Sequence, residues 1–75
     1  MKVRQIVGDN IRGYRHAKGW SQEKLGIRAR LHYNYIGSVE RSEKNISIDS
    51  IASIAKALNI PLFEFFIEGS YQKEK

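Results

Sequence analysis

The chain has 75 residues, no cysteine, and 13 lysines and arginines against 8 acidic residues, a net charge of +5. A chain of this length forms one small domain with one modest core, which leaves no room for a separate substrate domain. Without cysteine it has neither disulfides nor thiolate metal sites, so its stability must come from packing.

Apolar residues recur with helical spacing from the start of the chain. Val7, Ile11 and Tyr14 fall at i, i+4 and i+7, which predicts a helix from about Arg4 to Ala17. Gly19 should end this helix, because glycine readily adopts the left-handed conformation that closes one.

A second, short helix is predicted over Gln22–Ala29. Ser21 is placed to cap its N-terminus, although Lys24 stands where a capping box has glutamate. Trp20 could pack on Leu25 as a hydrophobic staple.

A third helix is predicted over Tyr33–Arg41, with Leu31, Ile36 and Val39 turned toward the core. Only three residues separate it from the second helix, so the two helices must cross steeply, as in a helix-turn-helix. The outer face then carries Tyr33, Asn34, Gly37, Ser38 and Arg41.

Two more helices are predicted after a loop at residues 42–47. Apolar spacing predicts a helix over Ile48–Leu58 that Asn59 ends, and Pro61 suits the first turn of a fifth helix over Pro61–Glu68. Residues 69–75 are expected to form a flexible tail. No stretch alternates long enough to predict a strand, so the predicted fold class is all-α, with a compact five-helix domain in residues 1–68.

Several segments of this chain resemble a known family. The segments are Ser-Gln-Glu-Lys-Leu at 21–25, Tyr-Ile at 35–36, Val-Glu-Arg at 39–41 and Ile-Ala-Lys-Ala-Leu at 54–58. They resemble the Cro/repressor-type (XRE-family) helix-turn-helix regulators, whose fold is lambda-repressor-like, and the resemblance covers about residues 6–68. Within that family, residues 35–41 followed by Lys-Asn-Ile-Ser at 44–47 are most similar to the controller proteins of restriction-modification systems.

Three residues depart from the family pattern around the third helix. Arg30 stands where the family has a glycine in the turn, so either the turn opens or Arg30 adopts a left-handed backbone. His32 replaces the Ser or Thr that caps the third helix, and Ser42 replaces a glycine after Glu-Arg. The core positions keep the family pattern, so these changes concern the turns.

The positive charge is concentrated in the first part of the chain. Residues 1–44 hold 10 lysines and arginines against 4 acidic residues, a net of +6, whereas residues 45–75 hold 3 against 4, a net of −1. A one-sided positive field attracts polyanions such as nucleic acid. An ordinary solubilising surface would produce the same charge.

The outer face of the third helix is predicted to enter the major groove of double-stranded DNA. Asparagine can pair there with adenine, serine can donate or accept, and a glycine lets the backbone approach closely. The predicted base contacts are Tyr33, Asn34, Gly37 and Ser38. For Tyr33 and Tyr35 the alternative is packing against a neighbouring helix.

Phosphate contacts are expected around this face. Gln22 lies in the first turn of the second helix, where free N–H groups and the helix dipole favour an anion. The predicted set is Gln22, Arg12, Tyr35, Arg41, Lys44 and Asn45. For Arg41, Lys44 and Asn45 a solvated loop is the alternative. The resemblance implies that Arg15 and Glu40 form a structural pair that orients the third helix.

The fifth helix carries more apolar surface than one core needs. Leu62, Phe63, Phe65, Phe66 and Ile67 cover more than the roughly 100° stripe that faces a core. A homodimer would bury the excess, with Leu62, Phe65, Phe66 and Ile67 as its predicted interface; a core helix with one exposed phenylalanine is the alternative. A symmetric dimer should prefer a palindromic operator.

The residues give little support for an enzyme. His16 and His32 lack the paired spacing of a metal site, and Ser21, Ser38 and Ser47 are better explained as caps, contacts or loop residues. We expect no metal, no cofactor and no small-molecule ligand. No apolar run approaches the roughly 20 residues of a membrane span and no secretory leader opens the chain, so the expected location is the cytoplasm.

Together these features predict a sequence-specific transcriptional regulator that binds an operator as a homodimer, with control of a restriction-modification system as its candidate role. RNA polymerase is a further candidate partner. Two alternatives stay open: an antitoxin that neutralises a toxin and represses its own operon, and an adaptor that uses the same helices to bind protein.

Overall fold

This computed structural model describes residues 2–74, in which helices are the only regular secondary structure. There are four α-helices, α1 (Val3–Ala17), α2 (Gln22–Ala29), α3 (Tyr33–Glu40) and α4 (Ile48–Leu58), followed by two 3₁₀-helices, η1 (Leu62–Phe66) and η2 (Ser70–Glu74). The predicted all-α class is therefore confirmed, and α2 and α4 have the predicted bounds. Within the described residues, no helix is both long enough and apolar enough to cross a lipid bilayer.

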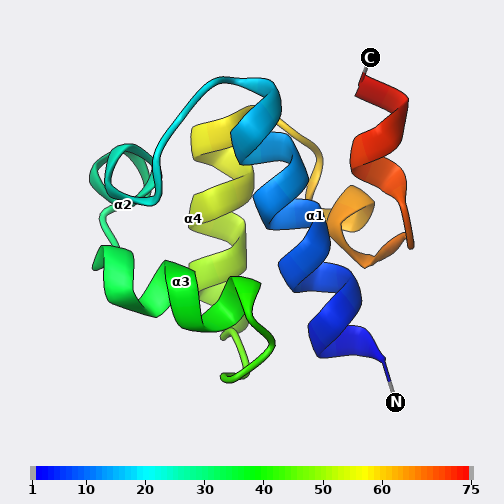
Figure 1. Cartoon of the computed structure of the whole chain (residues 1–75), viewed down its shortest axis with the longest axis horizontal. Coiled ribbons are helices and arrows are strands. Elements are labelled where there is room, and N and C mark those ends of the chain that lie inside the picture. The colour runs from blue at the N-terminus through cyan, green and yellow to red at the C-terminus, as the bar shows by residue number, and fades with distance from the viewer. Residues whose placement is uncertain (1, 75) are drawn as a thin grey trace.

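The helices are arranged around α1 and α4, which lie at the centre of the molecule (Figure 1). The helices α2 and α3 lie on one side of this pair, and η1 and η2 lie on the other. Buried apolar side chains from all four α-helices and η1 form one core: Val7, Ile11, Tyr14, Leu25, Ala29, Ile36, Val39, Ile51, Ile54, Ala55, Leu58 and Phe65.

Local signals in the sequence set most helix ends. The Ser21 hydroxyl accepts a hydrogen bond from the Lys24 N–H at 3.0 Å, and Ser47 caps α4 in the same way through the Ser50 N–H. Gly19 and Asn59 follow α1 and α4 in the left-handed conformation, with φ of 71° and 59°. These caps satisfy end groups that have no partner inside the helix.

The turn between α2 and α3 has an arginine in the left-handed conformation. Arg30 adopts the left-handed conformation, with φ 61° and ψ 42°, so the turn is not opened. A Cβ at Gly26 would lie 2.5 Å from the Leu31 carbonyl oxygen, which explains the glycine there. His32 takes over the cap of α3, because its Nδ1 accepts from the Asn34 N–H at 3.0 Å. Ser42 is also left-handed, with φ 64°.

The predicted fifth α-helix over Pro61–Glu68 is wrong. The backbone of Pro61 is extended, with ψ 139°, and a short 3₁₀-helix covers only Leu62–Phe66 before the chain extends again at Ile67. The physical reason is tertiary: the Asn10 side chain of α1 donates to the carbonyl oxygens of Phe65 and Ile67, each at 2.9 Å.

The segment after residue 68 also differs from the flexible tail that the sequence suggested. Gly69 turns the chain with φ 74°, and residues 70–74 form η2, which lies along α1. Ser70 is buried, and the Tyr71 N–H donates to Asn10 Oδ1 at 3.2 Å. The folded unit therefore extends beyond residue 68.

Candidate nucleic-acid interface

The outer face of α3 is polar and is held in place by a buried inner face. Ile36 and Val39 are buried, whereas Tyr33 and Asn34 are exposed at the first turn and Ser38 is half-buried. The Tyr33 ring stacks on His32, with ring centroids 4.8 Å apart. The Asn34 side-chain amide makes no hydrogen bond to the described residues, so its donors and its acceptor point to solvent.

Gly37 is covered, contrary to the prediction of an exposed base contact. An added Cβ would lie 3.0 Å from Arg41 Nη1 and 3.1 Å from Gln22 Oε1, because both side chains lie across the middle of α3. The missing side chain of Gly37 therefore makes room for Gln22 and Arg41. These two long polar side chains, rather than the glycine backbone, form the surface at this point of the helix.

Glu40 connects α3 to both neighbouring helices. Its carboxylate is buried and accepts from Arg15 Nε at 2.7 Å and from Arg15 Nη2 at 2.9 Å. Gln22 Nε2 also donates to Glu40 Oε1 at 3.1 Å, and Arg15 Nη1 donates to the Trp20 carbonyl oxygen at 2.9 Å. A bidentate arginine–carboxylate contact fixes orientation as well as distance. The pair that the resemblance implied thus joins α1, α2 and α3.

Arg12, which was predicted to contact phosphate, is largely occupied by the same helix. Its Nη2 donates to the Glu40 carbonyl oxygen at 3.1 Å, and its Nε lies 3.6 Å from Glu40 Oε1. The guanidinium thus satisfies a carbonyl at the C-terminal end of α3, where positive charge is favourable. Arg12 supports the position of α3, and only part of its side chain remains exposed.

The segment after α3 carries the remaining predicted phosphate contacts. Arg41, Lys44 and Asn45 are exposed, and Arg41 pairs with Glu43 through contacts of 3.0 and 3.2 Å. This hydrogen-bonded pair raises the pKa of the Arg41 guanidinium and lowers the pKa of the Glu43 carboxyl. Because both groups are exposed, the pair is easily exchanged for a contact with phosphate.

Tyr35 of α3 contacts the end of the loop that joins α3 to α4. Its ring packs partly against the core, and its hydroxyl accepts from the Ser47 N–H at 3.4 Å. Of the two alternatives considered for Tyr35, this geometry matches packing.

A basic cluster beside the first turn of α2 was not predicted. Lys18, Lys24 and Arg28 surround the half-buried Trp20 ring, with charged groups 5.4 to 5.8 Å from its centroid. The signal was present in the sequence, because residues 24 and 28 lie four apart and so share one face of a helix. The cluster adds positive charge close to Gln22.

A second exposed surface, which is apolar, lies beside the segment that follows α3. Phe65 is 0% exposed and packs edge to face on Tyr14, with ring centroids 5.3 Å apart, so its predicted place in a dimer interface is wrong. Phe63, which is 64% exposed, points outward instead. We define the apolar patch as the exposed residues Val3, Ile48, Leu62, Phe63, Phe66 and Ile67.

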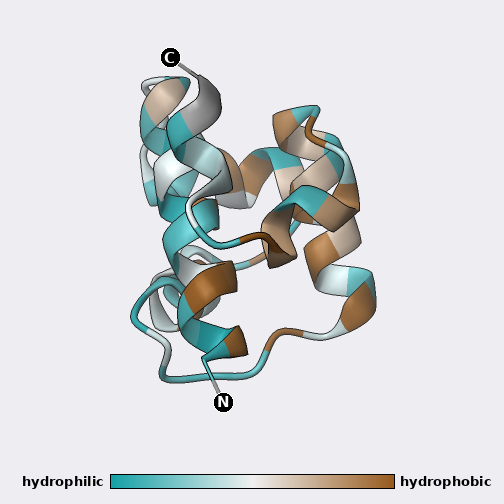
Figure 2. Cartoon of the chain, turned by 90° about the vertical axis from the view of Figure 1, so that its right-hand side faces the viewer, coloured by the Kyte–Doolittle hydropathy of each residue, from teal (hydrophilic) through white to brown (hydrophobic). Residues whose placement is uncertain are grey.

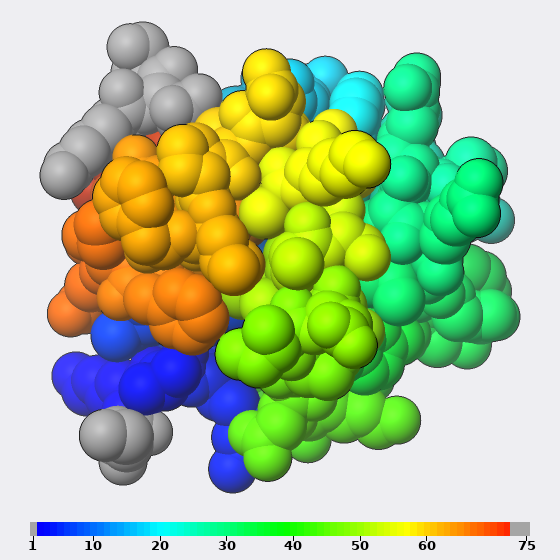
Figure 3. Space-filling model, turned by 180° about the vertical axis from the view of Figure 1, so that it is seen from behind, coloured from blue at the N-terminus to red at the C-terminus, as the bar shows by residue number. Residues whose placement is uncertain are grey.

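The apolar patch combines three segments that are distant in sequence. Figure 3 shows the start of α1 in dark blue, the start of α4 in lime and η1 in orange meeting on one face. Hydrophobic ribbon at the same three places is visible in Figure 2. Val3, Ile48 and Phe66 share the walls of a groove of about 180 Å³. Exposed apolar surface of this kind is typical of surfaces that bind another molecule.

Among residues 2–72, whose side chains the structure describes, no group of three potential metal ligands from His, Asp and Glu lies together. The predicted site residues lie on two surfaces that adjoin, because Lys44 and Asn45 line the same groove as Val3, Ile48 and Phe66. One surrounds the outer face of α3, and the other is the apolar patch.

Known proteins are similar to this chain in sequence. A family model described as helix-turn-helix matches residues 11–65. Control protein C.SmaI of Serratia marcescens is 44% identical over 59 residues, which cover 79% of this chain and 70% of that protein. Control protein C.BamHI of Bacillus amyloliquefaciens is 36% identical over 77 aligned residues, which cover 97% and 95% of the two chains.

The fold is also found in solved structures. The crystal structure of the restriction-modification controller protein C.AhdI from Aeromonas hydrophila matches with a TM-score of 0.84 and 38% identity. The match covers 88% of this chain and 100% of that chain.

Proposed function

Because the chain belongs to the helix-turn-helix family of XRE-type DNA-binding transcriptional regulators, we propose that it binds a palindromic operator as a homodimer and controls a restriction-modification system. The observation that carries this proposal is the anchored outer face of α3. Its exposed Tyr33 and Asn34 stand on a helix that Glu40 fixes to α1 and α2.

The electrostatic part of the proposal rests on where the positive charge lies. The net charge of +6 over residues 1–44 belongs to the part of the chain that contains α1, α2, α3 and the following turn. Lys44 is exposed beyond the C-terminal end of α3. The three basic residues around Trp20, which are Lys18, Lys24 and Arg28, are exposed at the α2 end of the helix-turn-helix. Each phosphate contact would release a condensed counterion, so operator affinity should fall steeply with salt.

The dimeric part of the proposal rests on the apolar patch. In a twofold dimer the same patch of both copies is in contact, so Phe63 and Phe66 of each copy would be covered by the apolar patch of the other. To contact two half-sites, such a dimer would have to present its two α3 helices about 34 Å apart, one turn of DNA. This spacing predicts a two-part palindromic site.

The assignment to a restriction-modification system rests on the relatives. C.AhdI is a restriction-modification controller, and C.SmaI and C.BamHI are control proteins. These relatives favour a controller over the antitoxin alternative. Contact with RNA polymerase follows from the regulatory role and remains a prediction.

Selection of operators from a random pool of DNA duplexes tests the proposal. We expect one preferred sequence with two inverted half-sites about one turn apart, bound by two copies of the protein. A single half-site bound by one copy would refute the dimeric arrangement. Equal affinity for all duplexes would refute sequence-specific binding altogether.

A further inference from the structure

Asn10 of α1 makes a set of buried hydrogen bonds that DNA binding by α3 does not explain. Asn10 is 0% exposed, and its Nδ2 donates to the carbonyl oxygens of Phe65 and Ile67, each at 2.9 Å, with the Glu64 carbonyl oxygen at 3.5 Å. Its Oδ1 accepts from the Tyr71 N–H at 3.2 Å. The amide therefore binds the backbone of the C-terminal segment on both sides of Gly69.

A second set of hydrogen bonds lies one turn further along α1. The Tyr14 hydroxyl and Ser70 Oγ are 2.6 Å apart, and Ser70 Oγ donates to Glu64 Oε1 at 3.0 Å. Because the single proton of Ser70 goes to the carboxylate, Tyr14 must be the donor in the first bond. We call Asn10, Tyr14, Glu64, Ser70 and the Tyr71 N–H the C-terminal network.

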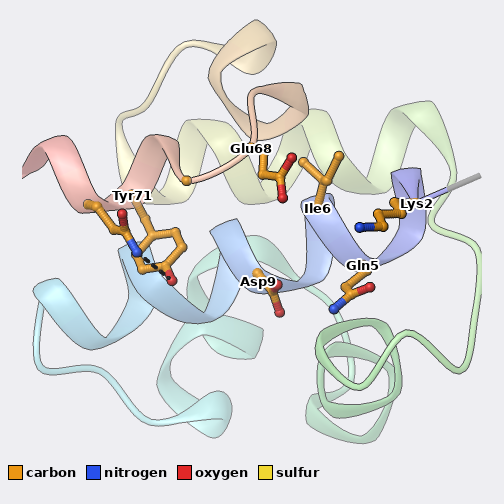
Figure 4. Close-up of a pocket in the computed structure, with 8 residues that line it drawn as sticks. Lys2, Gln5, Ile6, Asp9, Glu68 and Tyr71 are labelled. Carbon is orange, nitrogen blue, oxygen red and sulfur yellow. Dashed lines mark hydrogen bonds between the residues drawn. The ribbon is translucent and has the colours of Figure 1, made fainter.

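Attachment of the segment is concentrated at this part of α1. A Cβ at Gly13 would collide with the Tyr71 ring, so the ring lies directly on the helix backbone. Toward the N-terminus of α1, a groove of about 380 Å³ separates Gln5 and Asp9 from Glu68 (Figure 4). Tight contact on this side of α1 thus coincides with the C-terminal network.

The segment cannot fix its own orientation. The two 3₁₀-helices η1 and η2 have five residues each, and such short pieces have poor hydrogen-bond geometry and no independent stability. The Asn10 bonds to the carbonyls of Phe65 and Ile67 flank Phe66, the residue between them. They fix the backbone with Phe65 in the core and Phe66 on the surface.

We propose that Asn10 is the positioning residue for dimerisation: it holds residues 62–71 so that the apolar patch has the shape a second copy recognises. The inference rests on the homodimer proposed above and adds to it a buried residue that contacts no partner. Asn10 acts through the segment and reaches neither DNA nor the second copy.

The test compares Asn10→Ala with wild type in sedimentation equilibrium and in hydrogen exchange. Loss of the amide bonds should raise the dimer dissociation constant at least about tenfold while α1 to α4 stay folded. Exchange should accelerate in residues 62–72 and stay unchanged in α2 and α3. Ser70→Ala removes only the second set of bonds and should weaken the dimer less.

Leu25→Ala is the matched control, because Leu25 is a core residue of α2, on the side of the molecule opposite η1 and η2. It should lower thermal stability without changing the dimer dissociation constant. If Asn10→Ala is folded and dimerises like wild type, the inference is overturned and the dimer stands. If Asn10→Ala does not fold, Asn10→Ser takes its place, and a folded Asn10→Ser that dimerises like wild type overturns the inference. A monomeric wild type would overturn both this inference and the dimeric function.

Discussion

The buried pair of Arg15 and Glu40 allows the sharpest test of how α3 is held. The two residues are 7% and 2% exposed, and the guanidinium donates to both carboxylate oxygens. We consider three variants: Arg15→Met, Glu40→Leu and the double substitution. Each single change leaves a buried charge without its main partner, which costs about 3–5 kcal/mol.

The structure predicts that the two single variants differ. After Arg15→Met, Glu40 keeps the Gln22 amide at 3.1 Å and the Arg12 guanidinium at 3.6 Å, so the cost should lie near the lower limit. After Glu40→Leu, Arg15 keeps only the Trp20 carbonyl oxygen among these partners, and Gln22 is released as well. Its cost should lie near the upper limit, a large part of the roughly 5–15 kcal/mol that stabilises a small domain.

Thermal unfolding followed by circular dichroism measures these differences. In a domain of this size each 1 kcal/mol shifts Tm by about 4–8 °C, so both single variants should melt at least about 12 °C below wild type. The double variant should melt above Glu40→Leu, because two apolar side chains leave no buried charge. If the two single effects simply add in the double variant, the ion pair does not hold α3 and the reasoning fails.

Four further predictions concern the two surfaces. Asn34→Ala should leave Tm nearly unchanged and reduce discrimination at one operator position by about 1–3 kcal/mol; identical base preferences in operator selection would place α3 elsewhere. Lys44→Ala should weaken binding to all duplexes alike and lower the slope of log affinity against log salt by about 1, measured by fluorescence anisotropy; an unchanged slope would remove its phosphate role. Glu43→Gln should raise affinity for operator and random duplexes together, because it frees the arginine that Glu43 binds; weaker binding would contradict this view. Phe63→Glu should give a folded monomer, whereas Phe65→Glu should not fold, because one side chain is 64% and the other 0% exposed; sedimentation and circular dichroism separate the two, and a dimeric Phe63→Glu would exclude the apolar patch.

The helices that sequence predicts well are those with local signals. The apolar spacing of α2 and α4, together with the hydroxyls of Ser21 and Ser47 at their first turns, is enough to give their bounds. The family resemblance is confirmed, because a helix-turn-helix family model matches residues 11–65 and a control protein is 44% identical. The left-handed Arg30 could be stated only as one of two alternatives, because the cost of that backbone depends on how the neighbouring helices pack.

The structure of the C-terminal segment could not be predicted from local sequence patterns. Four of the five residues of η1 are apolar, so their spacing does not tell which side faces the core. The relevant signal lies far away, in Asn10, which stands on the apolar stripe of α1 between Val7 and Ile11. A polar amide in such a position needs buried partners. Its partners are backbone groups more than fifty residues further along the chain, which no spacing rule identifies.

The prediction that Gly37 is an exposed base contact was wrong for a related reason. A glycine on an exposed helix face favours close approach of some other group, and the sequence cannot say which group that is. The structure places Gln22 and Arg41 over it. The sequence had located both residues near the DNA surface, but their contact across the glycine depends on the crossing of α2 and α3.

The two proposed surfaces take their positions from one helix. Arg15 of α1 binds Glu40 and so positions α3, whereas Asn10 of α1 binds the carbonyls of Phe65 and Ile67 and so positions part of the apolar patch. Five residues along an α-helix correspond to a rise of about 7.5 Å and a rotation of about 140° net, which places the two side chains on nearly opposite sides. No flexible linker separates these contacts. One rigid α-helix therefore contributes to the distance between α3 and the apolar patch, and the proposed recognition of two half-sites by a dimer would require that distance to be fixed.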